Sequence, residues 1–406
     1  MTETVPSQDG LPTARRCPLD PPEELGKLRA EEPISRMAFP DGHLGWLVTS
    51  HAGVKAVLGG REFGSRADLL RAPIPLAMAA QPTEVSPGMF TAMDPPEHTR
   101  YRKLIAGWFT MRRMRQLEPR IEQIVAEHLD AMERVGGPVD LVQAFAEPVS
   151  ALVISELLGV PARDQDRFLA ATKALFGVHS SAEDAIAGWQ GIREFLLELV
   201  AAKRADPAED LISQLVTEGD LTDQELITIG SLLLVAGHDT SNNQLALSVH
   251  ALFRHPEQLA ALVADPELVP GAVEELLRYL TIVHIGSIRA ALEDTELDGH
   301  RLAAGDAVSL SLSAANRDPE VFEDPDTLDI TRSASSHVAF GHGVHQCVGQ
   351  QLARAELRVA LTALLRRFPD LRPAGDPDQV RMRTDSIIYG VHELPVTWGN
   401  HTESEE

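Results

Sequence analysis

The chain has 406 residues, 44% of them hydrophobic, which is enough for a large buried core and excludes a disordered protein. Sixty acidic and 36 basic residues give a formal net charge of −24, which argues against nucleic acid and anionic membranes as partners. No apolar run approaches the ~18 residues of a membrane span, and residues 1–20 lack the pattern of a signal peptide. We therefore expect a cytoplasmic protein. Only two cysteines occur, Cys17 and Cys347, so a disulfide framework is excluded.

The spacing of apolar residues predicts a mainly α-helical chain with a minor β component. The expected helices cover residues 23–31, 51–58, 95–107, 111–134, 143–158, 162–176, 182–204, 208–217, 222–254, 266–280 and 347–367. Short strands are expected at 34–39, 44–49 and 285–290, within 297–310, and in an apolar pair at 387–391 and 394–398. Since no linker or internal repeat interrupts the chain, we expect one domain over 21–399 between flexible tails at 1–20 and 400–406.

Residues 72–93 form a long apolar loop that carries a single charge, Glu84. Loops of this length in compact domains are commonly lids or binding segments, so this stretch is expected to contribute to a binding pocket.

Cys347 lies in a glycine-rich loop that opens into a helix and reads Phe340-Gly341-His342-Gly343-Val344-His345-Gln346-Cys347-Val348-Gly349. A thiol at a helix N-terminus feels the positive end of the helix dipole, which favours the thiolate. Glycines permit unusual backbone angles and remove side chains that would obstruct a flat ligand. From these residues alone, a buried structural cysteine and a catalytic nucleophile are the alternatives to a metal ligand.

The helix expected over 222–254 begins with a capping box, Thr222-Asp223-Gln224-Glu225. Its centre, Ala236 to Asn243, consists mostly of poor helix formers, and Thr240 could bond back to the carbonyl of Ala236 and open the helix locally. A solvent-facing polar patch would have amphipathic flanks. Because residues 232–235 form a continuous apolar run instead, we expect the centre to be buried.

Two further groups of charged residues have an ordinary alternative explanation. Glu275 and Arg278 are three apart on one helix face, where they could form a simple surface ion pair. His98, Arg102, Arg289 and His345 could each be a solvated basic group.

Taken together, these motifs resemble those of the cytochrome P-450 family over nearly the whole chain. The cysteine loop matches Phe-x-x-Gly-x-x-x-Cys-x-Gly, the central helix contains Ala-Gly-x-Asp-Thr, and Asn316-Arg317-Asp318-Pro319 matches the segment that leads into the family's irregular meander. The resemblance implies a single-domain fold with haem b between the central helix (about 222–254) and the cysteine-loop helix (about 347–367). The length and composition match soluble, actinobacterial members.

The resemblance also implies residue roles. Cys347 is the expected iron ligand, Asp239 and Thr240 deliver protons to iron-bound O2, and Glu275 and Arg278 form a buried structural lock. The implied cofactor-binding residues are His98, Arg102, Ala236, Gly237, Arg289, Phe340, Gly341, Gly343, His345, Cys347 and Gly349. The expected substrate pocket comprises Met89, Leu232, Val235, Ala236, Val283, Ile285 and Ile388.

The implied function is a monooxygenase that hydroxylates or epoxidises a hydrophobic small molecule, with a macrolide, another polyketide or a terpenoid as the expected substrate class. The alternatives are a peroxide-driven peroxygenase, which would not need Asp239 and Thr240, and a haem-thiolate sensor, which would need an output domain. We expect a monomer that receives electrons from a ferredoxin and its reductase, docked on basic residues such as Arg112, Arg113, Arg354 and Arg358.

Overall fold

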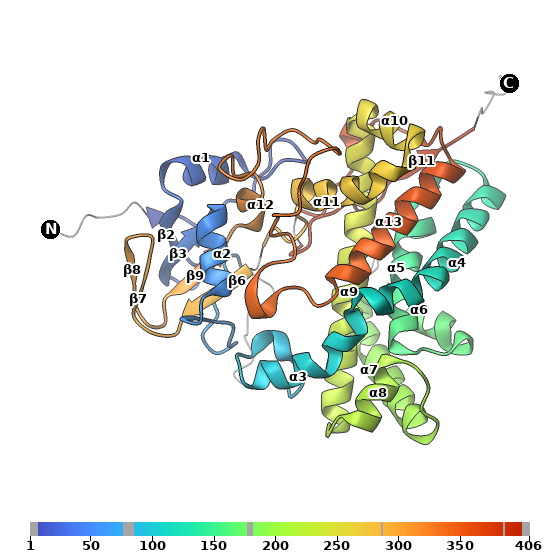
Figure 1. Cartoon of the computed structure of the whole chain (residues 1–406), viewed down its shortest axis with the longest axis horizontal. Coiled ribbons are helices and arrows are strands. Elements are labelled where there is room, and N and C mark those ends of the chain that lie inside the picture. Colours follow the sequence, from blue (N-terminus) through green and yellow to red (C-terminus); the bar gives the residue numbers. More distant parts are fainter. Residues whose placement is uncertain (1–6, 76–84, 177–181, 286, 385, 400–406) are drawn as a thin grey trace.

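The computed structural model describes residues 7–75, 85–176, 182–285, 287–384 and 386–399. Its centre is a long helix, α9 (Asp223–Arg254), which packs against α5 (Glu147–Leu158), α7 (Ala182–Ala205) and the cysteine-loop helix α13 (Gln350–Arg367) (Figure 1). The expected capping box starts α9: the Thr222 side chain accepts a hydrogen bond from the Glu225 amide, and the Glu225 carboxylate accepts one from the Thr222 amide. The mainly helical fold class is confirmed.

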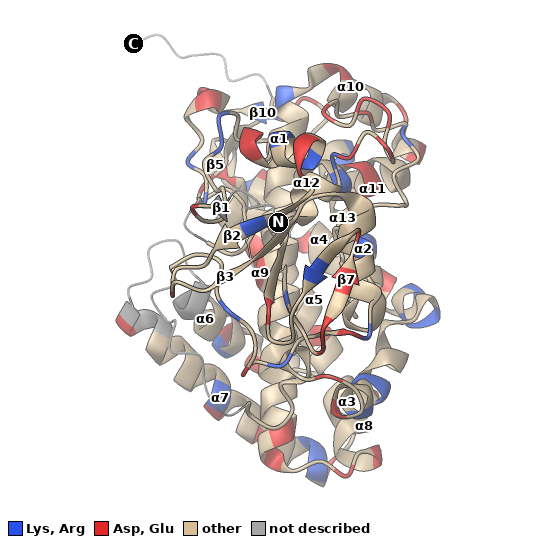
Figure 2. Ribbon diagram, turned by 90° about the vertical axis from the view of Figure 1, so that its left-hand side faces the viewer, with Lys and Arg blue, Asp and Glu red and all other residues tan. Residues whose placement is uncertain are grey.

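The other α-helices within the described residues surround this centre. They are α1 (Glu23–Glu31), α2 (His51–Gly59), α3 (Glu97–Ala106), α4 (Met111–Val135), α6 (Gln165–Phe176), α8 (Leu211–Glu218), α10 (Pro256–Ala264), α11 (Val269–Leu280) and α12 (Leu312–Ala315). Acidic and basic residues are interspersed along these helices (Figure 2). Among the described residues, no helix combines the length and apolarity that a membrane crossing requires.

A six-stranded sheet lies to one side of the helices, with the strand order β1-β2-β3-β9-β6-β4 (Figure 1). Its strands are β1 (Ser7–Gln8), β2 (Ile34–Ala38), β3 (Leu44–Val48), β4 (Phe63–Gly64), β6 (Ser287–Ala291) and β9 (Ala307–Leu310). A second sheet has three strands in the order β10 (Arg372–Pro373), β11 (Pro395–Thr397) and β5 (Val139–Asp140). A third sheet consists of β7 (Thr295–Leu297) and β8 (His300–Leu302).

Two local features differ from a simple tail and a simple strand pair. Within the expected N-terminal tail, β1 pairs with β2, Leu19 is buried, and the guanidinium of Arg15 lies 3.9 Å from the centre of the Tyr389 ring. Residues 387–391 do not form a strand paired with 394–398. Instead Ile388 forms an isolated β-bridge with Val283, and Val391 forms one with Met382, because these partners lie outside regular strands. Residues 1–6 and 400–406 lie outside the described residues.

Candidate active site

The cysteine loop folds back on itself before α13. The amide of Cys347 donates to the carbonyl of Phe340 over 2.9 Å, and both Gly341 and Gly343 have positive φ, as their glycine identity predicted. A Cβ on Gly343 would lie 2.3 Å from the carbonyl oxygen of Leu58. Gly343 is not among the residues that line the cavity described below, so the structure gives it a packing role against α2 in place of the expected role beside a flat ligand.

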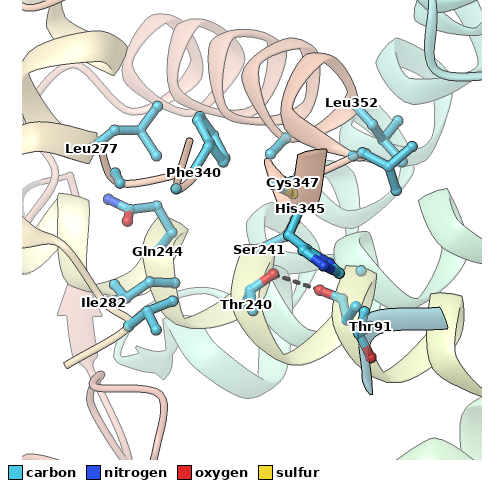
Figure 3. A pocket seen from close by; sticks show the side chains of 18 of the residues that line it. Thr91, Thr240, Ser241, Gln244, Leu277, Ile282, Phe340, His345, Cys347 and Leu352 are labelled. Atoms are coloured by element: carbon cyan, nitrogen blue, oxygen red, sulfur yellow. Dashed lines mark hydrogen bonds between the residues drawn. The ribbon is translucent and has the colours of Figure 1, made fainter. Parts of the chain in front are cut away.

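The loop forms one wall of a cavity of about 370 Å³, a size typical of small-molecule sites. Figure 3 shows Phe340, Cys347 and Leu352 on one side and Thr240, Gln244 and Ile282 on the other. Further lining comes from the following residues: Leu58, Ser65, Thr91, Phe109, Ile154, Leu233, Ala236, Gly237, Ser241, Leu277, Val283, Ser287, Arg289, Leu312, Ala339, Gly341, His342, His345, Val348, Gly349, Ala353 and Leu357. The mainly apolar wall suits a hydrophobic ligand.

The accessible surface of Cys347 faces this cavity, while protein surrounds the rest of the residue. The helix α13 begins only at Gln350, three residues later than expected. Burial raises the pKa of the Cys347 thiol, while hydrogen bonds from the backbone N–H groups of Gly349 and Gln350 and the charges of Arg102 and Arg354 act in the opposite direction. A cation bound at the sulfur would add to these opposing effects and favour the thiolate.

One face of α9 forms the opposite wall. The residues of this helix that line the cavity are Leu233, Ala236, Gly237, Thr240, Ser241 and Gln244, a spacing that places them on one side of a helix. The Thr240 hydroxyl donates to the carbonyl of Ala236 over 2.6 Å, as predicted (Figure 3). The helix nevertheless remains continuous from Asp223 to Arg254, so this bond does not interrupt it.

Asp239 is not among the residues that line the cavity, whereas its neighbour Thr240 is. Its carboxylate accepts hydrogen bonds from Arg383 Nη1 over 2.9 Å and from Asn243 Nδ2 over 3.0 Å. Arg383 is 144 residues away in sequence, and no motif in the sequence indicated this partner.

Four basic side chains gather at the edge of the cavity. The rings of His98 and His345 are 4.2 Å apart, and Arg289 and His345 line the cavity itself. Burial lowers the pKa of His98, Arg102 and Arg289, and burial together with the neighbouring cations lowers the pKa of His345 to about 3.

Among the described residues, these basic groups have few protein partners of opposite charge. Among the described residues, neither Arg102 nor Arg289 forms an ion pair within 4 Å, and both ring nitrogens of His98 lack a hydrogen-bond partner. The nearby acid is Asp94, whose Oδ1 lies 3.9 Å from His345 Nε2. Four desolvated basic groups beside one acid fit a ligand that brings carboxylates to this edge, as the propionates of haem would.

The comparisons with known proteins agree with this geometry. A model of the cytochrome P450 family matches residues 263–388. Cytochrome P450 105C1 of a Streptomyces species is 48% identical, over 98% of this chain and 100% of that protein. This chain belongs to the cytochrome P450 family.

Other members of the P450 family show similar coverage. Pentalenic acid synthase of Streptomyces avermitilis is 41% identical, over 98% of this chain and 100% of that protein. The 20-oxo-5-O-mycaminosyltylactone 23-monooxygenase of Streptomyces fradiae is 41% identical, over 95% and 92%. Two solved structures are also similar, and each match covers 97% of this chain and 100% of the chain in the solved structure. CYP105P1 in complex with filipin I has 44% identity and a TM-score of 0.88, and CYP105N1 from Streptomyces coelicolor has 40% identity and a TM-score of 0.90. The chain is a P450 monooxygenase, and this family uses O2 at a haem held by a cysteine thiolate.

In this P450 the expected Glu275–Arg278 lock is present and fully buried. Arg278 Nε and Nη2 donate to the Glu275 carboxylate over 2.7 and 2.8 Å, and Nη1 donates to the carbonyls of Asn316 and Pro325. The Glu275 carboxylate also accepts from the amide of Asp329. The pair therefore holds α11 against the chain that precedes the cysteine loop.

Of the residues expected in the substrate pocket, Ala236 and Val283 line the cavity. Met89, Leu232, Val235, Ile285 and Ile388 do not line it. Leu232 and Val235 are out of phase with the cavity face of α9, and Ile285 is buried in the core at 3% exposure. The missed lining residues include polar Thr91, Ser241 and Gln244, because a search for apolar positions passes over them. Residues 76–84 of the apolar loop lie outside the described residues.

Bacterial P450s generally receive electrons from a ferredoxin and its reductase. Of the four expected docking residues, three already have acidic partners. Arg113 pairs with Glu209 over 2.7 Å, Arg354 binds Glu274 through two hydrogen bonds, and Arg358 pairs with Glu118 over 2.7 Å. Among the described residues, Arg112 has no ion pair within 4 Å.

Proposed function

We propose that this P450 binds haem b through Cys347 and inserts one oxygen atom of O2 into a hydrophobic small molecule, either a macrolide or related polyketide or a terpenoid. The observation that carries the proposal is that Cys347 and Thr240 line opposite sides of one apolar cavity, whose edge holds four basic groups near one acid, Asp94. We further propose that the protein is a cytoplasmic monomer.

The haem would supply the activation of O2 and the oxidation of the substrate. The contributions of the protein begin at the edge of the cavity, where Arg102, Arg289, His98 and His345 would hold the propionates through charge-assisted hydrogen bonds. The apolar wall orients the substrate and excludes water, which strengthens every electrostatic interaction inside.

Proton delivery is assigned to Asp239 and Thr240. Thr240 presents its hydroxyl to the cavity, and Asp239 follows on the next face of α9, where it contacts Arg383 near the end of the chain. The carboxylate can take a proton from the outer side and pass it toward the hydroxyl of Thr240, the atom from which it would enter the cavity. This pair favours a reductive monooxygenase over a peroxygenase, because peroxide brings its own protons.

The relatives support the substrate class. Pentalenic acid synthase and 20-oxo-5-O-mycaminosyltylactone 23-monooxygenase are named for a terpenoid product and a macrolide substrate. The largely aliphatic lining of the cavity in this chain suits either. Binding of macrolide aglycones and of cyclic sesquiterpenes can be compared through the shift in iron spin state that follows displacement of water.

The decisive first experiment is the optical spectrum of the reduced, carbon-monoxide-bound protein. A Soret band strongly shifted to the red, and lost in Cys347→His but retained in Cys17→Ser, supports the proposed ligand. A folded protein that takes up no haem, or the same spectrum in Cys347→His, would contradict it. Turnover with ferredoxin and NADPH but little turnover with hydrogen peroxide then separates the monooxygenase from the peroxygenase.

A further inference from the structure

Asp239, the acid of the proposed proton path, is held from outside its own helix. Its Oδ1 accepts from Arg383 Nη1 over 2.9 Å, and from Asn243 Nδ2, one turn along α9, over 3.0 Å. The two side chains of the ion pair are only 19% and 13% exposed. A pair so shielded from water is screened less than a surface pair and keeps its geometry more firmly.

Arg383 lies in residues 381–384, which bind residues 390–392 further along the chain in a hairpin-like arrangement. The amide of Arg383 donates to the carbonyl of Gly390 over 2.9 Å, the amide of His392 donates to Arg381, and Met382 bridges Val391. The guanidinium is thus carried by an anchored backbone.

The same segment is in direct contact with α9. A Cβ placed on Gly390 would lie 2.0 Å from the side-chain oxygen of Asn243, so only glycine allows the segment to approach α9 this closely. Asn243 in turn binds both the carboxylate and the carbonyl of Asp239. Two contacts from one segment therefore fix the outer side of the acid.

On its other side the segment contacts the cavity wall. The amide of Tyr389 donates to the carbonyl of Ile282 over 2.7 Å, and Ile388 bridges Val283. Ile282 and Val283 both line the cavity. The segment that carries Arg383 thus lies between the cavity wall and the acid.

We propose that Arg383 is a positioning residue for Asp239, which keeps the carboxylate on the outer side of α9 in reach of solvent protons and so sets the rate of proton delivery to Thr240. The inference rests on the proposed function of Asp239. In the reductive reaction each O2 takes two electrons and two protons, and one oxygen enters the product while the other leaves as water. Hydrogen peroxide brings the same two protons and electrons, so a peroxide-driven reaction does not need the path.

The test compares Arg383→Gln with Arg381→Gln in the haem-loaded enzyme. Arg381 is the matched control, since it lies on the same segment but pairs with Glu393 at the surface, with side chains 62% and 45% exposed. The probe is 7-ethoxycoumarin, whose O-deethylation is followed by fluorescence, once with ferredoxin, reductase and NADPH and once with hydrogen peroxide. We expect Arg383→Gln to lower the NADPH-driven rate about tenfold, with a larger solvent isotope effect, and to leave the peroxide-driven rate within about twofold. Arg383→Lys should recover part of the loss.

A second readout is independent of turnover. Hydrogen–deuterium exchange should increase in Arg383→Gln both at residues 386–392 and at 237–244, and in Arg381→Gln at neither. Asp239→Asn separates the two ideas. If Asp239→Asn keeps the NADPH-driven rate, the proposed proton path fails. If Asp239→Asn loses that rate while Arg383→Gln behaves like Arg381→Gln in both readouts, the role of Arg383 alone is refuted. Equal losses of the NADPH-driven and peroxide-driven rates in Arg383→Gln would also refute it, by showing a general structural defect.

Discussion

The Glu275–Arg278 pair and the basic edge of the cavity both bury cations, yet they are built in opposite ways. Arg278 is 0% exposed and donates to a carboxylate and to three backbone carbonyls, so its charge is satisfied by the protein. Arg289 is desolvated, which lowers its pKa, and within the described part of the chain its side chain donates only to the neighbouring carbonyl of Ile288. A buried charge that the protein satisfies stabilises a particular fold, whereas one that it leaves unsatisfied is a place prepared for a ligand.

The largest expected effect comes from two matched substitutions, which test this difference in the haem-free protein. Arg278→Met leaves the buried Glu275 with Arg332 as its remaining ionic partner among the described residues and removes the donor of three backbone carbonyls, and we expect it to lower the free energy of unfolding by about 3–5 kcal/mol. Arg289→Met removes a desolvated cation that has no acidic partner within 4 Å among the described residues, and we expect no loss of stability. Urea unfolding followed by circular dichroism measures both. Equal destabilisation by the two substitutions would contradict the distinction between a buried charge that the protein satisfies and one that it leaves for a ligand.

Glu356 is an intermediate case, a fully buried acid whose partners are hydroxyls. Ser150 Oγ donates to it over 2.5 Å and Ser241 bonds to it as well, but burial dominates and raises its pKa to about 7, from an ordinary 4.5. Since the folded pKa lies above the unfolded value, the protonated form is the one that the fold favours. Its contribution to stability is complete below pH 4.5 and is lost as the pH rises through 7, by up to about 3 kcal/mol.

Glu356→Gln should therefore remove this pH dependence. We expect the variant to be more stable than the wild type at pH 8 and similar to it near pH 4.5, in urea unfolding at a series of pH values. Glu225 offers a control of opposite sign, because hydrogen bonds from Thr222, Tyr101 and Arg100 outweigh burial and lower its pKa to about 2. Its contribution is present above pH 4.5 and lost on acidification, so Glu225→Gln should be the less stable protein at pH 7. Parallel curves for Glu356→Gln and the wild type would show that Glu356 does not titrate in this range.

Some of these contacts could be predicted from the sequence alone, and others could not. The fold class, the capping box of α9 and the Thr240–Ala236 bond follow from local patterns, and the structure confirms them. The family motifs predicted that Cys347, Thr240 and the four basic groups belong to one site. The partner of Asp239 could not be predicted, because Arg383 is far away in sequence and lies in an irregular segment with no periodicity. Leu232 and Val235 were expected to line the pocket but do not line the cavity. Hydrophobicity alone does not reveal which face of a helix that is buried on most sides points to a cavity.

A third prediction concerns haem affinity, where the edge cations should matter most. Arg289→Met should weaken haem binding about tenfold, or ~1.4 kcal/mol, because one charge-assisted hydrogen bond to a propionate is lost. Transfer of haem to excess apomyoglobin measures the dissociation rate. Arg358→Met is a suitable control, since Arg358 is already bound to Glu118 and does not line the cavity. Faster haem loss in the control than in Arg289→Met would contradict the assignment of the edge.

The smallest expected effect extends the comparison to the surface. Among the four arginines expected to dock ferredoxin, Arg113, Arg354 and Arg358 already have acidic partners, and Arg112 has no ion pair within 4 Å among the described residues. An arginine without such a partner keeps its full field for an approaching acidic protein, so Arg112→Glu should slow ferredoxin association about threefold to tenfold at low salt. Arg358→Gln should change it less, because Glu118 has already neutralised much of that charge. Stopped-flow reduction of the carbon-monoxide-bound enzyme at two ionic strengths distinguishes these outcomes. If Arg358→Gln slows the reaction more than Arg112→Glu, the salt bridges seen here must open when ferredoxin binds, and partnered charges on this surface would still belong to the docking site.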